Sequence, residues 1–243
     1  MTNDLFKEEF KVKSEEIKKA LNWEIDYPCP NCGHKSRDDA FKAIEITAGL
    51  SNWDCPNCII ERKGAHQDAD EACWELPSFR NLVNTFQLPF LDGYLQCLLL
   101  CQDRDIYLYF EDDESEPTKP LPAFWYDLSS AFVKIYTALE VYLSYQTRRQ
   151  LQEKGTKEDV IKYIKPQVRD SFEMWEKLGI WNGLGERINE KELKELKRIR
   201  GKFFSCQEAR NKIVHDGYIV AREEFLEVFD SVGRFIAGSQ KYL

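Results

Sequence analysis

The chain has 243 residues, of which 43% are hydrophobic and 13% aromatic, and this composition excludes an intrinsically disordered protein. A chain of this length buries enough apolar surface for one large domain or two small ones. The formal net charge of −8 disfavours nucleic acid as a partner, but residues 119–243 carry 22 Lys and Arg against 18 Asp and Glu. The first 118 residues therefore carry the other 12 and 24, which indicates two units with different roles.

The chain begins "MTNDLFKEEF", which is charged from its start and lacks the apolar stretch of a signal peptide. No apolar run approaches the length that a membrane-spanning helix requires. We therefore expect a cytoplasmic protein with no membrane partner.

Four of the eight cysteines fall into two Cys-x-x-Cys pairs, "CPNCG" and "CPNC", with 22 residues between the pairs. Two such knuckles surround a tetrahedral zinc ion, with the intervening segment closing as a hairpin, and a reducing cytoplasm disfavours disulfides. The predicted ligands are Cys29, Cys32, Cys55 and Cys58. Four thiolates close the coordination shell, so we expect Zn²⁺ to be structural; His34 and His66 are possible substitute ligands that the site does not need.

Residues 1–75 are expected to form an N-terminal helix and this zinc-ribbon module, an α+β unit. Between the knuckles three basic residues stand against four acidic ones, which offers no stripe for binding phosphates. The module is therefore interpreted as a folding staple that also docks a partner or the second domain.

Residues 76–118 are expected to be a connecting α/β segment that ends in an acidic linker. The segment holds the apolar stretch "YLQCLLLCQD", whose Cys97 and Cys101 behave as small buried hydrophobes, and the strand-like "DIYLYF". Prolines and a run of acidic residues in "EDDESEPTKPLP" are typical of a linker.

The pattern of residues 119–243 is helical, so the fold class predicted for the whole chain is mainly α. A first helix is indicated by apolar residues three and four apart from Leu128 to Tyr142, and a second covers about residues 157–178. The stretch "GIWNGLGERIN" is rich in turn residues, and a third helix starts near Glu190. A fourth helix follows from residue 225 to 236, which gives a four-helix up-and-down bundle.

The third helix contains an arginine where a leucine is expected. Its apolar stripe advances by three or four residues through Leu196, Ile199, Phe203, Cys206, Arg210 and Ile213. Asn211 and His215 lie on the neighbouring stripe, so the three polar side chains are predicted to converge on one groove. Gly217 then ends the helix.

An arginine stem along the edge of a core and a histidine in the last turn of a helix are both common, so the spacing alone is a weak signal. In context, "RNKIVH" resembles the active-site motif of HEPN-domain ribonucleases, in which arginine is followed four to six residues later by histidine and often directly by asparagine. The acidic position in "TALEVYL" of the first helix matches as well. The resemblance covers about residues 121–243, and it departs from many relatives in having Asp216 between His215 and Gly217.

The resemblance implies a HEPN-like four-helix bundle with endoribonuclease activity that needs no metal. Arg210, Asn211 and His215 would be catalytic, and Glu140 would be the partner of Arg210. His215 would be the proton-transfer group, and Arg210 supplies a planar donor fork for phosphate. The family works as homodimers with facing motifs, leaves 2′,3′-cyclic phosphate ends on its RNA substrate, and serves in antiphage defence, toxin–antitoxin systems and RNA processing.

Two further hypotheses stay open from the sequence. In one, the chain is a non-catalytic adaptor whose bundle and zinc ribbon bind other proteins, and such a protein tolerates loss of His215. In the other, the acidic N-terminal half is a regulatory or sensing domain that covers the basic cleft, with a regulatory protein partner as a possible trigger.

Overall fold

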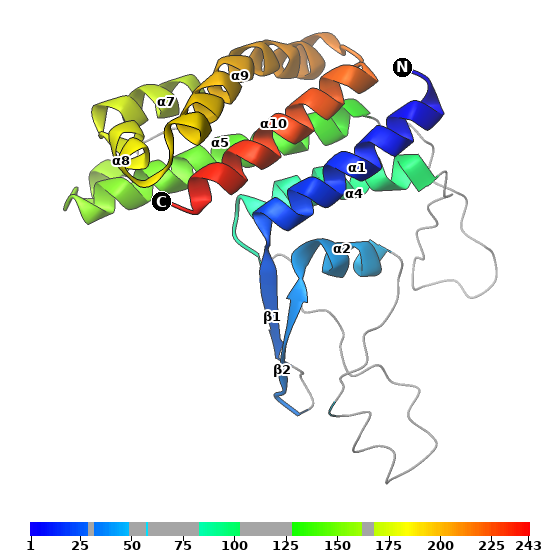
Figure 1. Cartoon of the computed structure of the whole chain (residues 1–243), viewed down its shortest axis with the longest axis horizontal. Coiled ribbons are helices and arrows are strands. Elements are labelled where there is room, and N and C mark those ends of the chain that lie inside the picture. The colour runs from blue at the N-terminus through cyan, green and yellow to red at the C-terminus, as the bar shows by residue number, and fades with distance from the viewer. Residues whose placement is uncertain (29–31, 49–56, 58–82, 103–127, 162–167) are drawn as a thin grey trace.

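The computed structural model describes residues 1–28, 32–48, 57, 83–102, 128–161 and 168–243. These residues are mainly helical, with one two-stranded antiparallel sheet, which confirms the mainly α class (Figure 1). The elements are α1 (Asn3–Leu21), β1 (Glu24–Pro28), β2 (Lys35–Asp39), α2 (Ala40–Ala48), α4 (Gln87–Gln102), α5 (Leu128–Glu153), α6 (Glu158–Ile161), α7 (Val168–Lys177), α8 (Ile180–Arg187), α9 (Glu190–Asp216) and α10 (Arg222–Gln240).

Helix α5 lies at the centre of the helical layer and carries the longest run of buried side chains. Helices α4, α7, α9 and α10 all contact it, and α1 packs on α10 from the other side. One continuous hydrophobic core therefore extends from Phe6 in α1 to Ala237 in α10. Where the structure describes them, residues 1–75, 76–118 and 119–243 all contribute side chains to this core. The HEPN-like topology stays a prediction.

The core of the molecule is built largely from aromatic rings. Phe10 of α1 and Tyr94 of α4 both stack near Phe229 of α10, with ring centroids 5.3 and 6.3 Å from it. At the other end, Phe172 and Trp175 of α7 lie 5.6 and 6.0 Å from Phe235. Large aromatic side chains bury much apolar area each, so the two ends of α10 are held from both halves of the chain.

Most of the segment from residue 179 to 189 forms helix α8, which corrects the expectation that it is a turn. Gly179 adopts a left-handed conformation with φ 75°, and α8 starts directly after it. Ile180, Trp181 and Leu184 are all buried against the core, and this burial outweighs the poor helix propensity of the glycines between them. The expected helix over 157–178 corresponds to α6 and α7, and residues 162–167 lie outside the described part of the chain.

The hairpin of β1 and β2 projects from the helical layer, with α2 leading back to it (Figure 1). Trp23 stacks on Phe41 with ring centroids 5.6 Å apart, and its indole Nε1 donates to Gln240 Oε1 at 3.1 Å. Glu45 of α2 accepts hydrogen bonds from Lys18 at 2.8 Å and from the Tyr94 hydroxyl at 2.6 Å. The base of the hairpin is therefore fixed to α1, α4 and the end of α10 by both aromatic and polar contacts.

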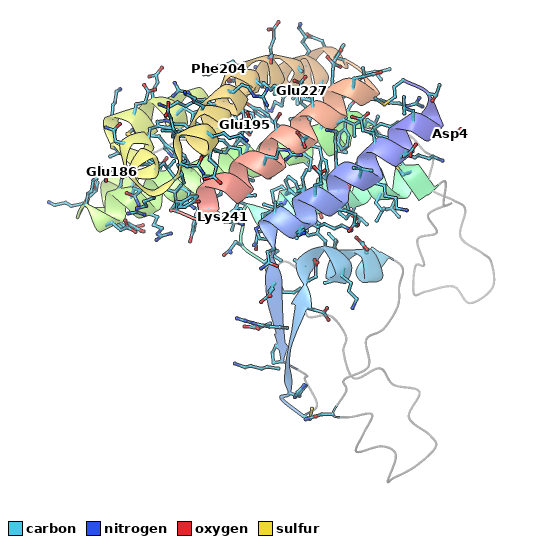
Figure 2. All side chains as sticks on the ribbon, viewed as in Figure 1. Asp4, Glu186, Glu195, Phe204, Glu227 and Lys241 are labelled. Carbon is cyan, nitrogen blue, oxygen red and sulfur yellow. The ribbon has the colours of Figure 1, made fainter. Side chains whose placement is uncertain are left out.

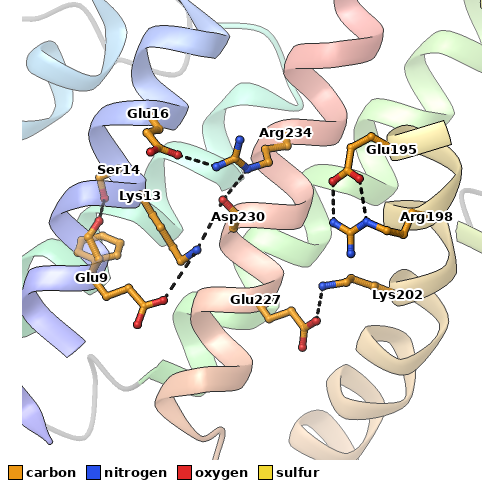
Figure 3. A network of polar contacts seen from close by, with 11 residues as sticks. Glu9, Lys13, Ser14, Glu16, Glu195, Arg198, Lys202, Glu227, Asp230 and Arg234 are labelled. Atoms are coloured by element: carbon orange, nitrogen blue, oxygen red, sulfur yellow. Dashed lines mark hydrogen bonds and ion pairs between the residues drawn. The ribbon is translucent and has the colours of Figure 1, made fainter. Parts of the chain in front are cut away.

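Ion pairs bridge the outer faces of the helices (Figure 3). Arg234 of α10 binds Glu16 of α1 at 2.6 Å and Asp230 of its own helix at 2.8 Å. Lys202 of α9 binds Glu227 of α10 at 2.6 Å. Exposed pairs of this kind contribute about 0–1 kcal/mol each, so they orient the helices more than they stabilise them.

Candidate functional site at the end of helix α9

The sequence of α9 places the candidate residues in its last two turns. Asn189 caps the start of the helix by accepting from the Glu192 backbone N–H at 2.9 Å. The buried positions then recur every three or four residues as Leu196, Ile199, Phe203 and Cys206. Arg210 is the next position on this face, as the sequence predicted, and it is half-buried.

The Arg210 guanidinium lies where α9 crosses α5. Its Nη1 donates to Asn211 Oδ1 at 3.2 Å. Its Nε is buried and has no hydrogen-bond partner among the residues that the structure describes. A buried donor without an acceptor is costly, so one end of this guanidinium is positioned for a contact that it does not yet make.

Glu140 of α5 lies within electrostatic reach of Arg210. Burial raises the pKa of its carboxyl above the ordinary value, and the positive charge of Arg210 opposes part of that rise. Within the described ranges, no hydrogen bond or ion pair joins the two side chains, and Arg210 Nη1 donates to Asn211. The structure thus brings the predicted partners together without closing a salt bridge between them.

Asn211 and His215 are exposed on the outer surface of α9. The prediction that three side chains converge on one groove therefore needs a correction, since Arg210 lies in the α5–α9 crevice while Asn211 and His215 face solvent. The reason is helical phase: consecutive residues are about 100° apart around the axis, and only Arg210 continues the buried stripe. The Arg210–Asn211 hydrogen bond links the crevice to the surface.

The chain after His215 is held firmly to the start of α5. Gly217 has φ 67° and ends α9, and the Tyr218 N–H donates to the Lys212 carbonyl at 3.2 Å. Ser129 donates to the Tyr218 carbonyl at 3.4 Å and accepts from the Val220 N–H at 3.1 Å. These bonds join the chain just after α9, the helix that carries His215, to the start of α5, the helix that carries Glu140. They therefore fix the two helices relative to each other.

Sequence reasoning missed one member of this crevice, Tyr136, whereas it placed Cys206 on the buried stripe beside Arg210. Tyr136 is fully buried one turn before Glu140, and its phenol interacts electrostatically with Glu140, Cys206 and Arg210. Its spacing of four residues from Glu140 on one helix was the available signal. Burial raises the pKa of the Cys206 thiol to about 12, so Cys206 stays protonated and does not act as a nucleophile.

Exposed apolar side chains lie along the second half of α9 and directly after it. The group consists of Phe204, Val214, Tyr218 and Ile219, with exposed fractions of 42%, 51%, 38% and 82%. Figure 2 shows Phe204 on α9 at the edge of the helical layer. The charges beside them are mixed, since Lys212 pairs with Glu208 at 3.0 Å and Asp216 adjoins His215. This surface, here called the α9 apolar patch, is suited to a protein contact more than to phosphates alone.

The predicted zinc site is partly within the described residues. Pro28 of β1 pairs with Lys35 of β2, so the connection between the strands contains Cys29 and Cys32. Cys32 is exposed at the tip of the hairpin, and Gly33 after it has φ 70°. An exposed Cys32 thiol followed by a left-handed glycine is compatible with one knuckle of a zinc ribbon, and the zinc site itself stays a prediction. Cys29, Cys55 and Cys58 lie outside the described residues.

The segment after the first knuckle differs from its expectation. Between the two predicted knuckles a hairpin was expected, but residues 35–48 form β2 and then α2. The hairpin is instead formed by β1 and β2, so it precedes the segment between the two predicted knuckles. Helix α2 begins directly after β2, where Asp39 Oδ1 accepts from the Phe41 backbone N–H at 2.7 Å.

No helix in the described part of the chain is both long and apolar enough to span a membrane. Comparison with known proteins finds no matching family model, no matching curated protein and no matching solved structure.

Proposed function

We propose that the chain is an endoribonuclease that cleaves RNA without a metal ion in its chemistry. The observation that supports it best is the pairing of the half-buried Arg210, beside Glu140, with the exposed His215 one and a half turns further along α9. One group can hold a phosphate from the crevice while the other faces the reacting atoms from the surface. The resemblance of "RNKIVH" to the HEPN motif adds to this geometry.

The proposed reaction uses the nucleophile that RNA itself carries. His215 takes the proton from the attacking 2′-OH and returns it to the leaving 5′-oxygen, and Arg210 donates to the phosphoryl oxygens. Asn211 holds one Nη group of Arg210 through the 3.2 Å hydrogen bond and leaves its remaining N–H donors for phosphate. Attack of the 2′-oxygen on phosphorus releases the 5′-oxygen, and the products are a 2′,3′-cyclic phosphate and a 5′-hydroxyl end.

A homodimer completes the site in this proposal. One arginine and one histidine are few groups for phosphoryl transfer, and the mixed charge around them holds RNA weakly. The α9 apolar patch adjoins His215, so a second copy docked on that patch places two motifs in one cleft. Self-association of a patch is the usual arrangement of two-fold dimers.

The zinc ion in this proposal is structural. Cys29, Cys32, Cys55 and Cys58 would hold it, and four thiolates leave no open position for a substrate. The hairpin of β1 and β2 projects from the helical layer, away from helix α9 (Figure 1). A cytoplasmic role in antiphage defence, or as a toxin with a regulatory protein partner, is the setting that the HEPN resemblance suggests.

Cleavage of single-stranded RNA in the presence of EDTA tests the function. We expect His215→Ala to slow cleavage by on the order of 10²–10⁴ while RNA binding persists. Arg210→Lys keeps the charge but loses the planar fork, and it is impaired as well. Arg198→Ala is the matched control, because Arg198 lies on the same helix and bonds Glu195 at the surface. Full activity of His215→Ala, or cleavage that requires added Mg²⁺, rejects the proposal.

The second candidate is a non-catalytic adaptor. The α9 apolar patch favours an adaptor, because exposed apolar residues among charges of both signs are typical of protein interfaces. An adaptor keeps its partner binding in His215→Ala and loses it in Ile219→Asp. A nuclease loses cleavage in the first of these variants.

A further inference from the structure

Two buried polar groups without partners lie near the Glu140 carboxyl in the crevice between α5 and α9. The Tyr136 hydroxyl and the Arg210 Nε are both buried and unbonded among the described residues. Glu140 lies one helical turn from Tyr136 on α5, and Cys206 lies one turn from Arg210 on α9. Burial of two unsatisfied donors beside a carboxyl is unfavourable unless the three groups bond one another in some state of the protein.

The donor and acceptor properties of these groups allow an arrangement in which Tyr136 connects the other two and all of them are satisfied. The Arg210 Nε–H can only donate, and an ionised Glu140 can only accept. A phenol can do both, and burial raises the pKa of Tyr136, so it keeps its proton at neutral pH. A chain from Nε–H to the Tyr136 oxygen, and from the Tyr136 O–H to the Glu140 carboxylate, therefore leaves no group unbonded.

We propose that Tyr136 is a positioning residue that connects Arg210 to Glu140 and orients the guanidinium for phosphate. This inference rests on the proposed ribonuclease function and deepens it. The Nε end of the guanidinium is held from the crevice by Tyr136, and Asn211 holds Nη1 from the surface. The plane of the fork is then fixed at two points, and the free Nη N–H groups point away from the core.

The fully buried position of Tyr136 makes the conservative variant informative. Tyr136→Phe removes one oxygen and leaves the ring in the core. If the hydroxyl had no role, its removal would be neutral or stabilising, because an unsatisfied buried group is lost. As a positioning residue, its loss lowers kcat by roughly tenfold, as expected for one hydrogen bond, and changes KM by less than about twofold.

Tyr142→Phe is the matched control. Tyr142 is equally buried on α5, but its hydroxyl bonds Ser239 Oγ of α10 at 2.8 Å. We expect this variant to lower the melting temperature and to leave kcat unchanged. The double variant Tyr136→Phe/Glu140→Gln should be no slower than the slower of its single variants, because both act through Arg210.

A spectroscopic measurement separates this inference from the proposed function. The ¹⁵Nε–H resonance of Arg210, assigned by its loss in Arg210→Lys, should exchange slowly with solvent in the wild type. It should lose that protection in Tyr136→Phe and in Glu140→Gln but keep it in Tyr142→Phe. If the wild type cleaves no RNA, the proposed function fails, and this resonance still decides whether the connection exists. If the Arg210 Nε–H keeps its protection in Tyr136→Phe, the positioning role is wrong. It is also wrong if the protection is lost but kcat stays unchanged.

Discussion

Substitution of Gly93 tests the packing of α4 on α5, which joins the two halves of the chain. A Cβ added at Gly93 would lie 2.8 Å from Ile135 Cδ1 and Cγ1 and 2.9 Å from the Ala131 carbonyl oxygen. The oxygen belongs to the backbone of α5 and cannot move aside as a side chain can. Gly93→Ala therefore forces the two helices apart at their closest approach.

The expected magnitude combines two opposing effects. Overpacking of this kind costs up to about 3 kcal/mol, and alanine regains about 1 kcal/mol through its better helix propensity. The net loss of about 2 kcal/mol corresponds to a fall of about 4–8 °C in melting temperature for a chain of this size. Thermal unfolding followed by circular dichroism at 222 nm measures this change.

Gly201→Ala is the control, because it is expected to change the stability in the opposite direction. Gly201 is exposed in the middle of α9, and a Cβ added there meets nothing within 4 Å. The variant should gain about 1 kcal/mol, or about 2–4 °C. If both variants are equally stable, or if Gly93→Ala is the more stable, α4 does not pack on α5 as described.

Three other predictions follow from the site and the zinc knuckle. Purified protein should contain close to one zinc per chain by metal analysis, and Cys55→Ser should remove it; folded wild type without zinc contradicts the predicted ligand set. Ile219→Asp, at a side chain that is 82% exposed, should leave the melting temperature nearly unchanged while light scattering shows a dimer becoming a monomer, and a monomeric wild type contradicts the composite site. Burial raises the pKa of Glu140, so the folded protein loses stability relative to Glu140→Gln as pH rises from about 4.3 toward the raised folded-state value. Below about pH 4.3 the free energies of unfolding of the two proteins, measured in urea, should approach each other. A difference that does not change with pH contradicts the burial of this carboxyl.

Local signals in the sequence were sufficient for the helix that carries the candidate site. The start of α9 at Glu190, the phase that places Arg210 on the buried stripe, and the glycine end at Gly217 were all predicted correctly. These features depend on residues within a few turns of one another, through capping, periodicity and the left-handed conformation that glycine accepts. The predicted mainly α class followed from the same periodicity.

Contacts between distant parts of the chain decided the rest. The glycine-rich segment forms α8 because Ile180 and Trp181 are buried, Trp181 against aromatic rings of other helices. Local helix propensity depends only on neighbouring residues, so it does not include these contacts. Arg210 and Asn211 are adjacent in the sequence, yet only the packing of α9 on α5 placed one in the crevice and the other in solvent. Tyr136 lies in this crevice for the same reason. Arg210 is 74 positions further along the chain, and only tertiary packing brings it within electrostatic reach of the Tyr136 hydroxyl.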